Sequence, residues 1–287
     1  MDLRPNGPRQ QNSSVVRTPF IPRWSDMPRS RVAASRAVDL GSPFLRRVTI
    51  RDDRVDPDRH PFDLPIFAGG LDLTFSTPVT FLVGENGTGK SSLLEAIAWS
   101  CGFTGRGGAK EHRYAEGDDG HTLGRALALV WKQKVADGFF LRAETFFNFA
   151  TYLEEVGSTF RAYGGQSLHE QSHGEAFLSL FNHRFEDGLF ILDEPEAALS
   201  PQRQLAFLRI LHTLTAPRIA QFLIATHSPM LLALPTATVL SLDGGRIRQV
   251  DYRETEHYQV TKNFLDAPER FFRYLLAEDD SEFDHSG

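Results

Sequence analysis

The stretch Gly84-Glu85-Asn86-Gly87-Thr88-Gly89-Lys90-Ser91 decides the fold of this chain. It matches the pattern G-x-x-x-x-G-K-[ST], it follows the apolar run at residues 79–83, and a helical pattern begins at Lys90. The glycines let successive backbone N–H groups point at one anion, and the positive end of the following helix strengthens the attraction. The sequence therefore predicts a strand, a phosphate-binding loop and a helix, in this order.

The side chains of this loop predict a nucleotide with a magnesium ion. Lys90 is expected to reach the β- and γ-phosphates, and the Ser91 hydroxyl is expected to ligate Mg²⁺. The residues expected to bind the nucleotide are Glu85, Asn86, Gly87, Thr88, Gly89, Lys90, Ser91 and Ser92. A chance glycine turn is disfavoured, because it would not require the strand before the loop and the helix after it.

Two later apolar runs also end in residues suited to phosphate chemistry. Residues 189–192 lead into Asp193 and Glu194. The first carboxylate suits Mg²⁺ through a water molecule, and the second can orient and polarise an attacking water. Residues 222–225 lead towards His227, for which a γ-phosphate contact is expected in the company of the other two motifs. Lys90, Glu194 and His227 are thus the candidate catalytic residues, and Ser91 and Asp193 are the candidate metal ligands.

The order of these three motifs resembles the ABC ATPase superfamily, most closely its soluble branch of RecF-, SMC- and OLD-like predicted ATPases, a group of AAA family ATPases. The resemblance extends over about residues 44–275. It implies that the chain binds ATP and Mg²⁺ and hydrolyses ATP to ADP and phosphate. It also implies an ATP-dependent head-to-tail homodimer, in which a signature loop of one subunit closes over the ATP of the other.

Two segments compete for the signature loop. The segment at 163–166 copies the Gly-Gly-Gln letters, and the segment at 171–175 copies the motif more loosely. Distance to Asp193 and the apolar helical pattern that follows favour the second segment, so Ser172 and Gly174 are the residues expected to contact ATP in trans. His173 stands where the family has a glycine.

Other family positions are less clearly occupied. Ser200 stands where an aspartate is expected. Gln133 and Glu144 are alternatives for the glutamine of the Q-loop, and Glu144 fits the family order better. Phe62 and Phe67 lie in the part of the chain from which an adenine-stacking aromatic would come.

Alternating strand and helix patterns predict an α/β fold: a P-loop NTPase with a mainly parallel sheet flanked by helices and an antiparallel β subdomain. Strands are expected at residues 44–50, 71–75, 79–83, 126–131, 138–142, 189–192, 219–224, 238–242 and 247–252, those at 126–131 and 138–142 being antiparallel. Helices are expected at 90–100, 146–156, 175–185 and 267–276, and a loop at 102–121. Residues 1–40 predict a disordered basic arm, 41–276 the ATPase domain and 277–287 an acidic disordered tail.

Composition limits the partners and the location that are expected for the protein. The net charge of −6 does not favour bulk binding of a polyanion, so a nucleic-acid partner would need a local basic patch. The chain has one cysteine and no apolar run long enough to span a bilayer, which favours a cytoplasmic protein without an integral membrane segment. No heptad segment separates Ser91 from Ser172, so SMC-type coiled coils are not expected there.

Three functions remain open at this point. The first is a stand-alone ATPase that works as an ATP-sandwich dimer in DNA repair or mobile-element defence. The alternative is the ATPase subunit of a membrane transporter, which the loose signature loop and the uncertain Q-loop disfavour. The third is a nucleotide switch that hydrolyses little, and Glu194 argues against it.

Overall fold

The computed structural model describes residues 41–103, 119–135, 137–143, 178, 181 and 187–276 of the 287-residue chain. All of them belong to one compact unit, Ala34–Gly287. The predicted arm at 1–40, the tail at 277–287, the helix at 146–156 and both signature candidates lie outside the described residues.

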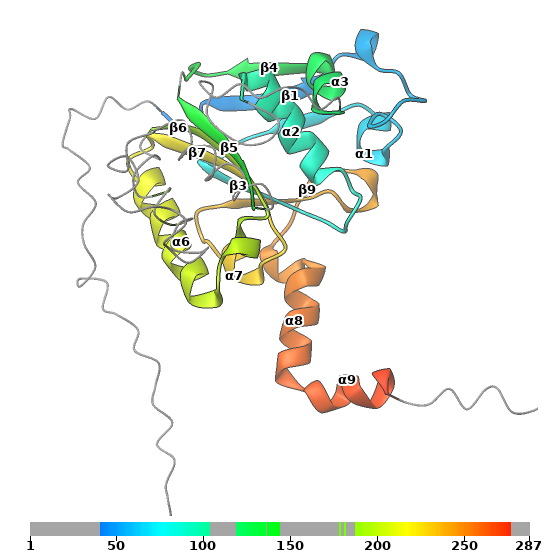
Figure 1. Cartoon of the computed structure of the whole chain (residues 1–287), viewed down its shortest axis with the longest axis vertical. Helices are drawn as coiled ribbons and strands as arrows, with labels where there is room; N and C mark the ends of the chain where they lie inside the picture. Colours follow the sequence, from blue (N-terminus) through cyan, green and yellow to red (C-terminus); the bar gives the residue numbers. More distant parts are fainter. Residues whose placement is uncertain are drawn as a thin grey trace, which may run out of the picture. The chain divides into compact units, whose positions relative to one another are not determined.

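The centre of the fold is a six-stranded sheet with the order β5-β6-β7-β3-β8-β9 (Figure 1). Its strands are β3 (Val79–Val83), β5 (Gly138–Arg142), β6 (Gly188–Asp193), β7 (Ala220–Ala225), β8 (Thr238–Ser241) and β9 (Arg248–Gln249). Neighbouring strands are parallel except for β9, which runs antiparallel to β8. This arrangement confirms the predicted α/β class with a mainly parallel sheet.

Both faces of this sheet are covered by core side chains. In β3, Val79, Phe81 and Val83 belong to one hydrophobic cluster, whereas Leu82 belongs to a second cluster. Strands β6 and β7 divide their residues between the same two clusters with the same period of two, because successive side chains of a strand point to opposite faces. A sheet buried on both faces explains why these strands read as continuous apolar runs in the sequence.

Helices and a second sheet form the covering layers. The first cluster includes side chains of α6 (Pro201–Thr215) and α7 (Pro229–Leu232), which lie on one side of the parallel sheet (Figure 1). The second cluster includes α2 (Lys90–Cys101), α3 (Asp119–Ala126) and α1 (Pro65–Ala68). It continues into an antiparallel sheet with the order β2-β1-β4, made of β1 (Leu45–Ile50), β2 (Asp72–Thr74) and β4 (Leu127–Trp131). This sheet is the predicted antiparallel subdomain.

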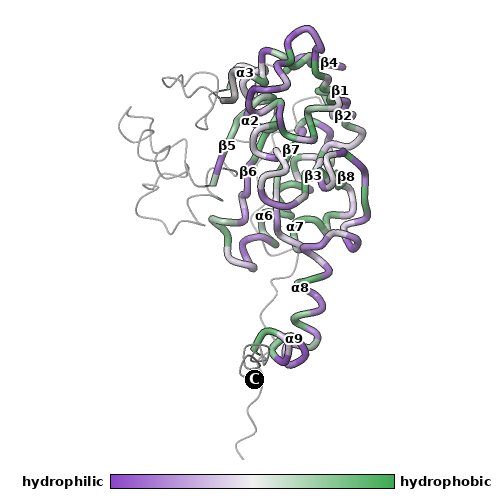
Figure 2. The backbone as a smooth tube through the Cα atoms, turned by 90° about the vertical axis from the view of Figure 1, so that its right-hand side faces the viewer, coloured by the Kyte–Doolittle hydropathy of each residue, from purple (hydrophilic) through white to green (hydrophobic). Residues whose placement is uncertain are grey.

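The remaining elements are short turns and two C-terminal helices. The 3₁₀ turns are η1 (Asp52–Arg54), η4 (Pro195–Ala198), η5 (Asp243–Gly245) and η6 (Tyr252–Glu254). Helices α8 (Glu256–Asp266) and α9 (Pro268–Leu275) contain no buried residue, and α9 alternates hydrophobic and hydrophilic positions (Figure 2). In the described part of the chain, no helix combines the length and apolar character needed to cross a membrane.

Several details of the sequence prediction were wrong. Strand β5 is parallel to β6 rather than antiparallel to β4, and its three consecutive buried residues, 139–141, are typical of a strand covered on both faces. Helix α3 begins at Asp119, inside the predicted loop at 102–121. It ends at Ala126, which was predicted to be the first residue of a strand. The predicted strand at 247–252 is reduced to β9 followed by η6, and the helices α1, α6, α7 and α8 were not predicted.

Candidate nucleotide-binding site

The predicted site residues meet because three neighbouring parallel strands end at the same edge of the sheet. Strand β7 lies between β3 and β6, with Leu82 opposite Ala225 and Asp193 also opposite Ala225. The loop after β3, the carboxylates at the end of β6 and the histidine after β7 therefore share one edge. In open α/β sheets this carboxyl edge is where ligands bind.

The loop at residues 84–89 needs glycine at positions where the backbone is left-handed and crowded. Gly84 has a φ of 147°, and a Cβ there would lie 2.9 Å from Asp243 Oδ1. Gly89 has a φ of 93°, and a Cβ there would lie 3.1 Å from the side chain of Ile66. The Thr88 hydroxyl closes the loop by donating to the Glu85 carbonyl at 2.9 Å. A tight loop with its backbone exposed is the form a phosphate-binding loop requires.

Lys90 lies at the start of α2 and is only 5% exposed. Its Nζ donates to the carbonyl oxygens of Gly84 at 2.6 Å and Glu85 at 2.8 Å. Burial lowers the pKa of Lys90, while the nearby carboxylates, led by Glu194 and Asp193, act in the opposite direction. The ammonium is thus held against the loop, where an ionised phosphate would be a stronger acceptor than a neutral carbonyl.

The oxygens expected to bind magnesium are next to each other. The Ser91 hydroxyl donates to Asp193 Oδ1 at 3.2 Å, and Asp193 is 4% exposed. Its other oxygen, Oδ2, lies 3.6 Å from Arg142 Nε, and Arg142 also forms an ion pair with Glu95. A hydroxyl and a carboxylate beside a phosphate loop fit Mg²⁺, which takes few protein ligands and fills its remaining positions with phosphate oxygens and water.

Glu194 and His227 form the second polar pair of the site. Glu194 adopts a left-handed backbone with a φ of 50°, which is uncommon for a residue other than glycine. His227 Nε2 lies 3.3 Å from Glu194 Oε1, and on the opposite side His227 Nδ1 lies 2.5 Å from His257 Nε2. Burial lowers the pKa of His227, and the charges of Lys90 and His257 lower it further.

The backbone next to His227 is fixed by a carboxylate from the turn after β6. Glu196, in η4, accepts a hydrogen bond from the His227 backbone N–H through Oε1 at 2.6 Å. Burial raises the pKa of Glu196. This contact ties the segment after Asp193 and Glu194 to the segment that carries the histidine.

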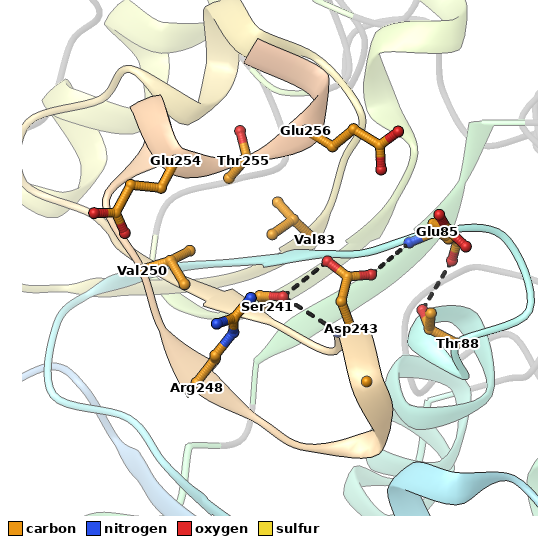
Figure 3. A pocket seen from close by; sticks show the side chains of 11 residues that line it. Val83, Glu85, Thr88, Ser241, Asp243, Arg248, Val250, Glu254, Thr255 and Glu256 are labelled. Carbon is orange, nitrogen blue, oxygen red and sulfur yellow. Dashed lines mark hydrogen bonds between the residues drawn. The ribbon is translucent and has the colours of Figure 1, made fainter. Parts of the chain in front are cut away.

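Asp243 holds the start of the phosphate loop from the other side (Figure 3). Its Oδ1 accepts a hydrogen bond from the Glu85 backbone N–H at 2.9 Å, and its Oδ2 accepts one from the Ser241 hydroxyl, also at 2.9 Å. Asp243 lies on the wall of a cavity of about 370 Å³, and Thr255 and Glu256 at the start of α8 line another part of its wall.

The structure brings most of the predicted residues together. Lys90, Ser91, Asp193, Glu194 and His227 all lie at the carboxyl edge of β3, β6 and β7. Residues 85–89 form the loop, and Ser92 lies in the first turn of α2. Ser172, Gly174 and Glu144 lie outside the described residues.

Two residues predicted near the site do not fit their expected role, and several residues that contact the site were not predicted. Phe62 and Phe67 are each 1% exposed and belong to the core, so neither offers a free ring face to an adenine. Sequence reasoning missed Arg142, Glu196 and Asp243, although Arg142 ends a recognisable strand and the other two closely follow one. It also missed His257, for which no local pattern gives a signal.

Strand order, loop and converging side chains define a P-loop nucleotide-binding domain. A family model described as an AAA domain matches residues 64–125, and one described as "AAA domain, putative AbiEii toxin, Type IV TA system" matches residues 176–233. The first match includes the phosphate loop, and the second includes the Asp193–Glu194 pair and His227. The two matches therefore fall on the parts of the chain that carry the predicted motifs, in agreement with the resemblance that these motifs indicated.

No curated protein sequence matches the chain. Similar solved structures include a putative metal-chelate type ABC transporter in an inward-facing conformation, with 15% identity, a TM-score of 0.44, and coverage of 75% of this chain and 88% of the other. Another is cbiO1 of Clostridium perfringens, part of the ABC transporter complex cbiONQ (16%, TM-score 0.41, 81% and 99% covered). The SMC head domain of Thermotoga maritima is also similar (16%, TM-score 0.40, 72% and 98% covered).

Proposed function

We propose that the chain binds Mg-ATP and hydrolyses it to ADP and phosphate as an ATP-dependent homodimer. The observation that carries the proposal is the convergence of a buried lysine, a hydroxyl–carboxylate pair and a glutamate–histidine pair around one phosphate loop. Each pair suits a different part of phosphoryl transfer to water. A loop that only bound phosphate would not need the second carboxylate, Glu194.

Each group has a task set by its place. Lys90 would exchange its two carbonyl acceptors for β- and γ-phosphate oxygens. Ser91 and Asp193 would hold Mg²⁺, which neutralises the charge that develops on the phosphates. Glu194, with its side chain half exposed, would orient and polarise the attacking water, and His227 would turn its Nε2 from Glu194 towards the γ-phosphate.

The dimer follows from the resemblance to ABC-type ATPases. In that arrangement Ser172 and Gly174 of one subunit would contact the γ-phosphate held by Lys90 of the other. Neither subunit alone would then hold a complete site, and ATP would favour the closed dimer because it binds that state better.

The process that hydrolysis serves is proposed to be mobile-element defence or DNA repair. The family description that matches residues 176–233 names a putative toxin of a type IV toxin–antitoxin system, which supports the defence reading. Among the described residues, no contact in the site favours the transporter alternative over this one.

The first test is Glu194→Gln. The variant should bind Mg-ATP with near wild-type affinity in calorimetry and hydrolyse it about 10²–10⁴ times more slowly, since that is the usual contribution of a group that activates water. Light scattering should show an ATP-dependent dimer most clearly in this variant. Turnover at the wild-type rate would assign the role of Glu194 to another residue.

The second test separates dimerisation from ATP binding by the monomer. Ser172→Arg would place a cation in the proposed interface, so it should block dimerisation and turnover while the monomer still binds ATP. Mixing Ser172→Arg with Lys90→Ala should restore part of the activity, because the mixed dimer has one site without either substitution. A protein that stays monomeric with ATP and hydrolyses it at full rate would contradict the sandwich arrangement.

A further inference from the structure

His257 contacts the site from an element that carries none of the family motifs. It lies in the first turn of α8, two residues after the N-cap Thr255. Thr255 is 7% exposed, accepts a hydrogen bond from the Tyr258 N–H and donates one to the Tyr252 carbonyl. The start of α8 is therefore anchored, and it holds the His257 ring in a defined place.

The two imidazole rings meet through their nitrogens. The ring planes differ by 8°, the centroids are 4.6 Å apart, and His227 Nδ1 lies 2.5 Å from His257 Nε2. Faces of stacked rings keep their atoms about 3.5 Å apart, so a nitrogen–nitrogen distance this short requires a hydrogen bond between ring edges. One of these nitrogens must carry the proton and the other must accept it.

The opposite side of His227 decides the direction of that bond. Nε2 faces the Glu194 carboxylate at 3.3 Å, and an ionised carboxylate can only accept. A neutral His227 with its proton on Nδ1 would turn a lone pair towards Glu194. With the proton on Nε2, His227 donates to Glu194, and its Nδ1 accepts from His257 Nε2–H. Burial and the charge of Lys90 lower the pKa of both histidines, which favours two neutral rings.

We propose that His257 is a positioning residue for His227: by donating to Nδ1 it fixes the tautomer with the proton on Nε2. This proposal rests on the proposed hydrolysis of ATP, because only that tautomer gives a neutral His227 a donor for a γ-phosphate oxygen. Without His257 only the Glu194 carboxylate favours the proton on Nε2, so a fraction of the His227 rings carries it on Nδ1 and presents a lone pair to the phosphate. His257 would thus act on the chemical step and not on the affinity for ATP.

The tautomer can be measured without any turnover. Long-range ¹H–¹⁵N correlation spectra of nucleotide-free protein at pH 7.5 report which ring nitrogen carries the proton, and spectra of His227→Gln and His257→Gln assign the two rings. In the wild type the signals of His227 should show an Nε2-bound proton. In His257→Phe the same ring should show the averaged shifts of a tautomer mixture.

Kinetics then separate a positioning role from a structural one. His257→Phe keeps a planar ring without a donor and should lower kcat about 10-fold with KM for ATP within 2-fold, because loss of a positioned group costs part of its catalytic contribution. His257→Gln places an amide N–H near the former Nε2 and should recover most of kcat. His212→Phe, an exposed histidine in the last turn of α6, is the matched control and should behave like the wild type.

The outcomes divide cleanly. Full activity of His257→Phe, or a His227 ring that keeps its Nε2 proton in that variant, overturns the proposal. Equal loss in His257→Phe and His257→Gln also overturns it, since it would indicate a packing role. If the wild type binds ATP without hydrolysing it, the proposed function fails, and the tautomer of His227 in wild type and His257→Phe still decides whether His257 positions the ring. If His257→Phe does not fold, the wild-type spectrum and the Gln variant decide.

Discussion

The phosphate site has two sides that are built differently. On one side, Lys90 follows the loop after β3, Asp193 ends β6 and His227 comes shortly after β7; every residue of these three strands is buried. On the other side, Asp243 lies in the η5 turn after β8, and His257 lies in α8, a helix with no buried residue. The first side presents groups that would touch the nucleotide, and the second side holds those groups or their loop in place.

This difference separates two kinds of functional residue. A side chain that follows a core strand is placed by the sheet itself, so its position is as rigid as the core. A side chain such as His257 is placed by the anchored start of a helix without buried residues, so a substitution there leaves the core of the sheet intact. Substitutions on the first side should therefore abolish ATP binding or hydrolysis. Substitutions on the second side should reduce them only in part.

Lys90→Ala should give the largest effect. The buried ammonium is the main positive charge facing the phosphates, and Lys90 is the lysine whose Nζ contacts the loop carbonyls. We expect ATP affinity in calorimetry to fall at least ~100-fold, since two hydrogen bonds to charged groups contribute ~1.5–3 kcal/mol each. Lys262→Ala, an exposed lysine of α8 that pairs with Asp266, should bind ATP normally. Unchanged affinity of Lys90→Ala would remove the loop from the nucleotide site.

The same division explains what the sequence could predict. The strands β3, β6 and β7 and the residues that follow them are encoded in short continuous stretches, so their chemistry can be read locally. To predict that Asp193 and Lys90 lie close together, only one further inference was needed: neighbouring parallel strands end at the same edge of the sheet. The residues that the sequence predicted to lie together therefore do so where a motif and a buried strand coincide.

The contacts that were missed depend on residues far apart in the chain. Asp243 meets Glu85 across 158 positions, and His257 meets His227 across 30 positions, with no pattern that marks either pair. The parallel pairing of β5 was missed for a related reason. Its apolar residues fit either sheet, and only packing against β6 decides between them.

Asp243→Ala tests the second side of the site. The variant frees the Glu85 N–H and the start of the loop, and it also removes a negative charge near the phosphates. We expect the first effect to prevail and to weaken ATP binding ~10-fold, the equivalent of one hydrogen bond to a charged acceptor. Asp243→Asn keeps an acceptor for the Glu85 N–H without the charge, so it should bind ATP at least as tightly as the wild type.

These two variants are informative together with Asp63→Ala as a control, because Asp63 is an exposed partner of His60. Calorimetry with Mg-ATP under one salt condition measures all three. If Asp243→Ala binds ATP more tightly than the wild type, repulsion of the phosphates outweighs support of the loop. Asp243 would then be a group that limits affinity.

The smallest expected effect is on the pH dependence of the free energy of unfolding. It again compares the two sides of the site, because His227 belongs to the first side and His257 to the second. The pKa values of both histidines lie below the usual value of 6.5, chiefly because burial disfavours the charged ring. The unfolded chain therefore binds more protons than the folded chain as pH falls from about 6.5 towards the folded pKa values. The stabilisation linked to this difference is fully present above about 6.5 and is lost progressively below it.

Urea unfolding of the nucleotide-free protein at several values between pH 7.5 and 5.5 measures this loss. In His257→Phe one of the two rings no longer titrates, and the remaining ring has lost a like-charged neighbour, so its pKa should lie closer to the usual value. The free energy of unfolding of the variant should thus fall less on acidification than that of the wild type. Glu196 does not disturb the comparison, because its raised pKa acts with the opposite sign and is common to both proteins. An equal or steeper loss in the variant would show that the two partly buried histidines do not titrate as a pair.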